Sequence, residues 1–119
     1  MRFRKKRTLD KYHAYRKNGD RPHCDFCVDE PQNKKYLFAH WKILKNMFPY
    51  DMIADFHDLI VPRRHFQCES EMTAAEREEL VYLKTEFLPK GKKYDIIWEN
   101  FAHMRSVDHY HVHILRFKK

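Results

Sequence analysis

The sequence predicts an α+β protein in which one antiparallel sheet of about five strands packs against one main helix, with a short N-terminal helix in addition. Short stretches rich in aromatic and branched residues recur along the chain, as is typical of strands. Between them, "TAAEREELVYLKTEFL" begins with a helix-capping pattern. At 119 residues the chain is expected to form a single domain, 1–119, of which 1–20 is a basic N-terminal helical extension.

The first expected element is the short helix of this extension. The stretch "TLDKYHAYRKNG" offers Thr8 as an N-cap and Gly19 as a stop. It follows "RFRKKR", which holds a large part of the formal net charge of +7. A solvated tail is the simplest interpretation, and attraction to nucleotides or RNA is the alternative. Nucleic acid is the less favoured partner, because aromatic residues do not interleave with the basic ones.

Four later stretches predict the sheet. The stretch "KYLFAHWKILKN" is one strand or two paired strands. A short apolar strand follows in "HDLIVPRRH", and Pro62 ends it. Two more strands, "YDIIWEN" and "DHYHVHILRF", lie near the end of the sequence. Strands on both sides of one helix favour a single antiparallel sheet.

The main helix has the clearest local signal. Thr73 and Glu76 are spaced as a capping box. Apolar residues then recur at helical spacing and predict a face that packs on the sheet: Leu80, Leu83 and Phe87. Pro89 and Gly91 end the helix.

Three histidines, His109, His111 and His113, alternate with apolar residues in the last strand. Successive side chains of a strand point to opposite faces, so the imidazoles share one face and the apolar residues share the other. Imidazole binds metals, carries protons and acts as a nucleophile near neutral pH. Chance clustering among nine histidines is the alternative, although histidine is costly to bury without partners.

Two of the three cysteines, Cys24 and Cys27, form a C-x-x-C pair. Such a pair supplies half of a tetrahedral zinc site, and a redox pair is the alternative. Cys68 stands alone and is interpreted as a packed free thiol.

The stretch "HYHVHIL" resembles the signature of the histidine triad (HIT) family of nucleotide hydrolases and transferases, and the resemblance extends from Cys24 to Leu115. It implies the HIT-like fold, a homodimer and a two-step reaction. His111 attacks the α-phosphorus of a nucleotide and expels the leaving group. Water or another acceptor then takes the nucleotidyl group, and His113 donates a hydrogen bond to the phosphoryl oxygens.

The resemblance also implies a structural zinc ion. In zinc-containing members the ligands include a histidine that follows an apolar strand and a proline, and the first histidine of the triad. The implied ligands are therefore Cys24, Cys27, His65 and His109. Such an ion leaves no position for water and ties the N-terminal cysteines to two distant strands.

The stretch "WKILKNMFPY" resembles a segment of the branch that contains galactose-1-phosphate uridylyltransferase, in which an asparagine lies at the nucleotide. This makes Asn46 a candidate for recognition of sugar or base. An ordinary turn residue is the alternative.

Three further residues are candidates for substrate binding. Ser106 corresponds to a family serine that contacts phosphate, with a plain turn serine as the alternative. Arg105 stands where many members have glutamine, in a loop that here has no glycine, and is a candidate phosphate clamp. His57 is expected to orient His111 or contact phosphate, or to be a structural histidine.

The sequence thus predicts a nucleotidyl hydrolase or transferase that acts through a nucleotidyl-histidine. A catalytically silent HIT-fold module that binds nucleotide or RNA is the alternative, and a histidine-rich metal buffer is a third. No apolar run approaches the ~18 residues of a membrane helix, so no membrane partner is expected. No apolar segment follows the charged start, which favours a cytoplasmic protein.

Overall fold

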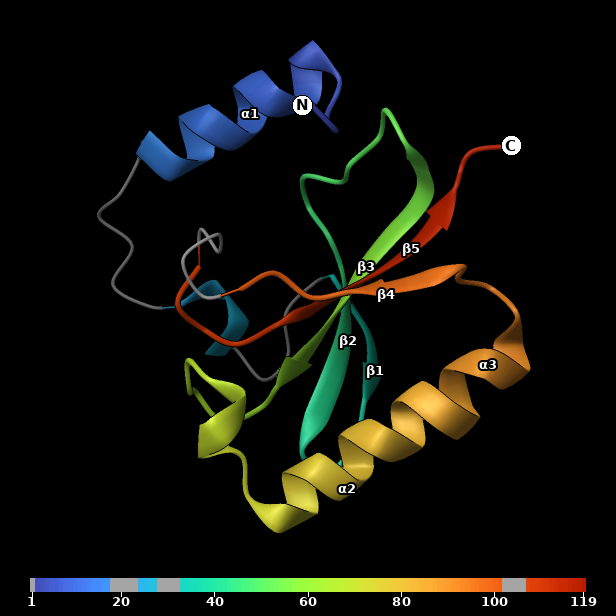
Figure 1. The fold of residues 1–119 in the computed structure, drawn as a ribbon. Coiled ribbons are helices and arrows are strands. Elements are labelled where there is room, and N and C mark those ends of the chain that lie inside the picture. The colour runs from blue at the N-terminus through green and yellow to red at the C-terminus, as the bar shows by residue number, and fades with distance from the viewer. Residues whose placement is uncertain (1, 18–23, 28–32, 102–106) are drawn as a thin grey trace.

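The computed structural model describes residues 2–17, 24–27, 33–101 and 107–119. Five strands form one antiparallel sheet in the order β1-β2-β3-β5-β4 (Figure 1). Their bounds are Lys34–Leu37 (β1), Trp41–Lys45 (β2), Ala54–Pro62 (β3), Ile96–Trp98 (β4) and Val112–Phe117 (β5). The predicted α+β class, with its five-stranded sheet, main helix and short N-terminal helix, is confirmed. Of the two forms expected for the first stretch, the paired strands β1 and β2 are the one observed.

The main helical run covers one face of the sheet. It consists of α2 (Ala74–Tyr82), a π-helical turn (Leu83–Phe87) and α3 (Leu88–Gly91). The predicted capping box is present, since the Thr73 hydroxyl accepts the Glu76 N–H at 3.1 Å and the Glu76 carboxylate accepts the Thr73 N–H at 2.8 Å. Local pairing of this kind depends only on residues three apart, which explains why the sequence reveals it.

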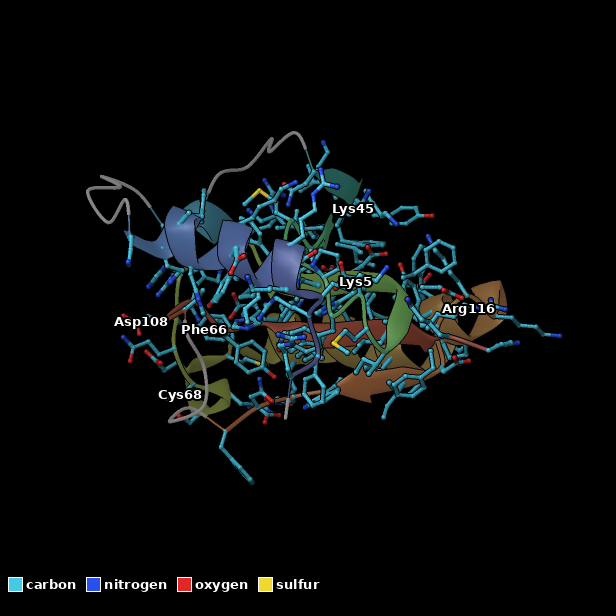
Figure 2. All side chains as sticks on the ribbon, turned by 90° about the horizontal axis from the view of Figure 1, so that it is seen from above. Lys5, Lys45, Phe66, Cys68, Asp108 and Arg116 are labelled. Carbon is cyan, nitrogen blue, oxygen red and sulfur yellow. The ribbon has the colours of Figure 1, made fainter. Side chains whose placement is uncertain are left out.

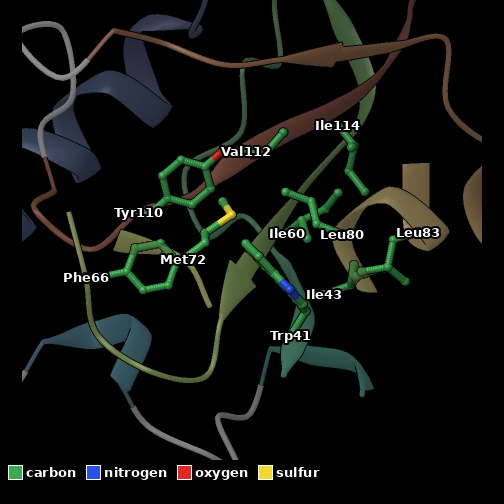
Figure 3. Close-up of a cluster of buried hydrophobic side chains, with 10 residues drawn as sticks. All are labelled: Trp41, Ile43, Ile60, Phe66, Met72, Leu80, Leu83, Tyr110, Val112 and Ile114. Atoms are coloured by element: carbon green, nitrogen blue, oxygen red, sulfur yellow. The ribbon is translucent and has the colours of Figure 1, made fainter. Parts of the chain in front are cut away.

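The core lies between this helical run and the sheet (Figure 3). Leu80 and Leu83 of the helical run pack there with the apolar residues that alternate with the three histidines. These apolar residues are Tyr110, Val112 and Ile114, each fully buried. The two-faced pattern predicted for the last strand is therefore observed, and it directs the three histidines to the opposite face of the sheet.

The last strand is shorter than the predicted stretch of residues 108–117. Strand β5 begins at Val112, so His109 and His111 precede its ladder with β3. Other hydrogen bonds replace the ladder here. The Tyr110 N–H donates to the Phe66 carbonyl at 2.7 Å, which keeps this segment extended against the core.

The N-terminal helix α1 (Lys6–Lys17) lies across the sheet from α2 and α3 (Figure 1). Seen from above, α1 lies over the sheet, with Lys5 beside its start (Figure 2). Tyr12 and Tyr15 contact Phe48 of the β2–β3 connection, with ring centroids 5.5 and 5.2 Å apart. None of the described helices is long and apolar enough to cross a membrane.

The prediction that Thr8 is the N-cap of α1 is wrong. The helix begins at Lys6, and the Thr8 hydroxyl donates to the Asp51 carboxylate at 2.5 Å. Asp51 also accepts the Lys5 N–H at 2.7 Å. A carboxylate from the β2–β3 connection therefore accepts hydrogen bonds at the start of the helix. Its negative charge also interacts favourably with the helix dipole. The predicted stop, Gly19, lies outside the described residues.

Candidate functional site

A cavity of about 280 Å³ lies on the histidine face of the sheet. His113 of β5 and His111, which directly precedes β5, line one side of it, and Asn46 and Phe48 line it from the β2–β3 connection. Residues of α1 and of the segment before it form a further wall. The cavity thus combines imidazoles, amides, aromatic rings and cations.

The tautomer of His111 is fixed by the main chain. Its Nδ1 lies 2.9 Å from the carbonyl oxygen of His109. A carbonyl only accepts hydrogen bonds, so Nδ1 carries a proton, and in the neutral ring the lone pair is on Nε2. An imidazole in this state is a neutral nucleophile that needs no base to remove a proton first.

A second chain of hydrogen bonds fixes His57 and His113. The Tyr50 N–H donates to Nδ1 of His57 at 2.9 Å, so the proton of neutral His57 is on Nε2. This N–H donates to Nδ1 of His113 at 2.8 Å. The proton of His113 is therefore on Nε2, and Nε2 is a buried atom without a hydrogen-bond partner among the described residues. Because His113 lines the cavity, this N–H is a donor prepared for a ligand.

Both imidazoles are held neutral by their surroundings. Burial lowers the pKa of His57 to about 4, and the nearby positive charge of Arg4 acts in the same direction. Burial also lowers the pKa of His113 far below its usual range, and neighbouring His57 and His111 disfavour its charged form further. Neutral rings are the states that the hydrogen-bond chain requires.

Asn46 lies beside this chain. Its Oδ1 accepts the Phe48 N–H at 2.8 Å, which directs the amide nitrogen toward Nε2 of His57 at 3.3 Å. Since Nε2 of His57 carries a proton, two donors face each other there. The Asn46 amide N–H therefore suits an acceptor in the cavity, such as a hydroxyl or phosphate oxygen.

A cluster of thiols and imidazoles adjoins the cavity. The ligand atoms of Cys24, Cys27, His65 and His109 all lie within 4.8 Å of one another. Nε2 of His109 lies 2.8 Å from the Pro62 carbonyl oxygen, so the lone pair of His109 is on Nδ1, within the cluster. Nδ1 of His109 lies 3.5 Å from each of the two Sγ atoms and 3.1 Å from Nδ1 of His65.

This cluster fits a tetrahedral zinc ion. Zinc bonds of about 2.0–2.3 Å place ligand atoms roughly 3.3–3.8 Å apart, close to the separations observed. Two thiolates and two neutral imidazoles also balance a divalent charge, and burial keeps His109 neutral by lowering its pKa to about 4. The donor set favours the metal interpretation of the C-x-x-C pair over a redox pair. Cys68 lies outside the cluster and is exposed, so its interpretation as a packed thiol is wrong.

The predicted substrate-binding residues have separate outcomes. Asn46 lines the cavity with His113, and His57 contacts both of them without being one of the lining residues. Ser106 and Arg105 lie outside the described residues, so their contacts stay predictions.

The sequence profile of the HIT domain matches residues 29–119 of the chain. The chain belongs to the HIT family. None of the curated proteins compared with the chain matches it. Both α1 and the cysteine pair precede the matched HIT region.

Solved HIT structures share the fold. A histidine triad protein from Clostridium difficile is 24% identical, with a TM-score of 0.62 over 84% of this chain and 95% of that one. A HIT family hydrolase from Legionella pneumophila is 19% identical, with a TM-score of 0.59 over 82% and 95% of the two chains. A histidine triad nucleotide-binding protein from Candida albicans is 21% identical, with a TM-score of 0.59 over 82% and 76%.

Sequence reasoning missed the residues that the N-terminal segment brings to the HIT domain. Arg4, Tyr12 and Tyr15 line the cavity together with Tyr50. The only signals were the basic composition of the extension and two tyrosines spaced three apart on one helix face. Neither signal predicts where the helix docks.

Proposed function

We propose that this HIT protein is a nucleotidyl hydrolase or transferase that forms a covalent nucleotidyl intermediate on His111. The observation that carries the proposal is the pairing of two opposite imidazole tautomers at one cavity. His111 presents a lone pair on Nε2 and His113 presents an N–H on Nε2, with ring centroids 5.1 Å apart. One group suits attack on phosphorus, and the other suits stabilisation of the oxygens of the same phosphoryl group.

The reaction follows from these two groups. Nε2 of His111 attacks the α-phosphorus, a P–N bond forms, and the leaving group departs with the electron pair of its bond to phosphorus. The His113 N–H donates to a non-bridging oxygen as negative charge develops there. Water then attacks phosphorus, the P–N bond breaks, and a nucleoside monophosphate is released. Another acceptor in place of water makes the enzyme a transferase.

His57 acts in this proposal as a positioning residue. It has no need to touch the substrate, because its Nε2–H holds the His113 ring in the tautomer that donates. Asn46 is proposed to bind the sugar or base through its amide. Ser106 and Arg105 are proposed to bind phosphate oxygens.

The proposed zinc ion is structural. Cys24, Cys27, His65 and His109 fill four positions, and none is left for a water molecule. When bound, the ion fixes His109, whose carbonyl in turn holds the tautomer of His111. The metal site and the nucleophile are therefore joined through one residue.

The printed descriptions of similar proteins support a nucleotide substrate. The Legionella relative is a hydrolase of the HIT family, and the Candida relative is a nucleotide-binding protein. A nucleotide is accordingly the proposed partner of the cavity. A homodimer, a cytoplasmic location and a single domain over residues 1–119 stay predictions.

Steady-state turnover of nucleoside phosphoramidates and dinucleoside polyphosphates tests the proposal. We expect His111→Ala to lower kcat by at least about 10³-fold. The matched control, His40→Ala, removes an imidazole outside the cavity and is expected to keep kcat within about two-fold. Retained activity in His111→Ala would contradict the proposal. Nucleotide binding by the wild type without turnover of any substrate would favour the silent binding module.

A further inference from the structure

A cation from outside the matched HIT region lies at the cavity. Arg4 precedes α1, and its guanidinium carbon lies 4.2 Å from the ring centroid of Tyr12 and 4.8 Å from that of Tyr50. Its Nε donates to the Phe48 carbonyl at 2.7 Å. Two rings and one carbonyl thus hold the guanidinium in place, which lowers the entropy lost when it binds a ligand.

Ring contacts locate Arg4 relative to the reacting histidines. Phe26 contacts His111 at 5.4 Å between centroids, and Tyr50 contacts His113 at 5.5 Å. Phe26 also contacts His109 and Tyr50 also contacts His57, so Phe26 lies on the His111 side of the pair and Tyr50 on the His113 side. Arg4 lies over Tyr50, at the His113 end.

The charge of Arg4 is available to a ligand. Among the residues that the structure describes, no carboxylate forms an ion pair with Arg4. Of the described side chains that line the cavity, three are cationic (Arg4, Arg16 and Lys45) and none is acidic. Burial is the main cause of the low pKa of His57. The positive charge of Arg4 lowers that pKa further, as expected if the guanidinium faces the histidines. A cavity of this kind suits a ligand with several negative charges.

In the proposed reaction, negative charge develops on the leaving group. When a polyphosphate nucleotide is attacked at the α-phosphorus, the bond to the bridging oxygen breaks and this oxygen keeps the electron pair. The departing phosphate gains negative charge that a guanidinium stabilises. An amine leaving group instead needs a proton, and a nearby cation does not stabilise its departure.

We propose that Arg4 binds the departing phosphate, so that the enzyme prefers nucleotides joined at the α-phosphate to a further phosphate over nucleotides joined to an amine. This inference rests on the proposed function. It assigns substrate selectivity to the N-terminal segment, outside the region that the HIT domain profile matches.

The test compares two substrates that carry the same nucleotidyl group. Values of kcat/KM are measured for diadenosine triphosphate and adenosine phosphoramidate, and for the matching guanosine and uridine pairs. We expect Arg4→Gln to lower kcat/KM for the triphosphate about 10- to 100-fold and for the phosphoramidate less than about three-fold. Arg7→Gln, which removes the same charge from an exposed position of α1, is expected to change both values less than about two-fold.

The ratio of the kcat/KM values for the two substrates distinguishes phosphate binding by Arg4 from a structural role of Arg4. Equal losses for both substrates, or no loss for either, would overturn the inference and leave the proposed function standing. No turnover of any pair by the wild type would overturn the proposed function and the inference with it. Arg4→Lys keeps the charge without the planar fork, and we expect a smaller but still selective loss. If Arg4→Gln fails to fold, an unchanged ratio in Arg4→Lys contradicts the inference.

Discussion

Main-chain groups decide which nitrogen of each imidazole carries its proton. The carbonyls of Pro62 and His109 fix His109 and His111, and the Tyr50 N–H fixes His57. A main-chain carbonyl cannot donate and a main-chain N–H cannot accept, so these assignments hold before any ligand arrives. The alternation of histidines predicts that they share a face. It does not predict their tautomers, because two of the three partners lie in other segments: Pro62 at the end of β3 and Tyr50 in the β2–β3 connection.

The free energy of unfolding is expected to depend on pH through His57. Burial lowers its folded-state pKa to about 4, whereas the unfolded chain has the usual value of 6.5. The unfolded state therefore binds an extra proton between these pH values. The stabilisation is complete above pH 6.5 and is lost as the pH falls toward 4, by about 3 kcal/mol at most for this one group.

Urea unfolding at pH 7.5, 6 and 5 measures this contribution. The wild type is expected to lose stability as the pH falls. His57→Gln, which has no titrating ring, is expected to lose less over the same range. Equal pH dependence in the two proteins would show that His57 does not contribute.

The capping of α2 could be predicted from the sequence, whereas the position of α1 on the sheet could not. The capping box of α2 joins Thr73 to Glu76, three residues away, and the sequence reveals it directly. The start of α1 instead depends on Asp51, 43 and 46 residues from its two partners Thr8 and Lys5. Burial would raise the pKa of Asp51, but these hydrogen bonds outweigh it and lower the pKa. The charged carboxylate is thus the form that anchors α1.

We expect Asp51→Ala to loosen α1 without unfolding the sheet. Helix α1 contains no fully buried residue, and loss of a cap costs about 1 kcal/mol, so the Tm is expected to fall by only a few degrees. Trypsin cleavage at the basic residues of α1 is expected to become several-fold faster. Asp10→Ala, which removes an exposed carboxylate of α1, serves as control and is expected to change cleavage little. Unchanged cleavage in Asp51→Ala would contradict the anchoring role.

Three segments distant in sequence meet in the cysteine and histidine cluster. The cysteine pair precedes the sheet, His65 follows β3, and His109 precedes β5. The resemblance to the family predicted this set of residues, whereas spacing alone marked only the C-x-x-C pair. The cavity needs a fourth segment, the N-terminal one, whose position depends on tertiary contacts that no local pattern encodes.

Metal analysis tests the cluster. The purified protein is expected to hold one zinc ion per chain, and chelation is expected to lower the Tm by 10 °C or more, on the order expected for loss of a structural ion. Cys24→Ser is expected to lose the ion. The matched control Cys68→Ser, at an exposed thiol outside the cluster, is expected to retain it. Full metal content in Cys24→Ser would refute this ligand set.

The mass of the intact protein shows whether the nucleotidyl group becomes covalently attached to His111. The wild type and His111→Ala are mixed with a substrate that the wild type turns over, and the reaction is quenched within the first turnover. We expect a mass increase of one nucleotidyl group in the wild type and none in His111→Ala. The same increase in both proteins, or product formed by the wild type with no adduct at any time point, would contradict this attachment.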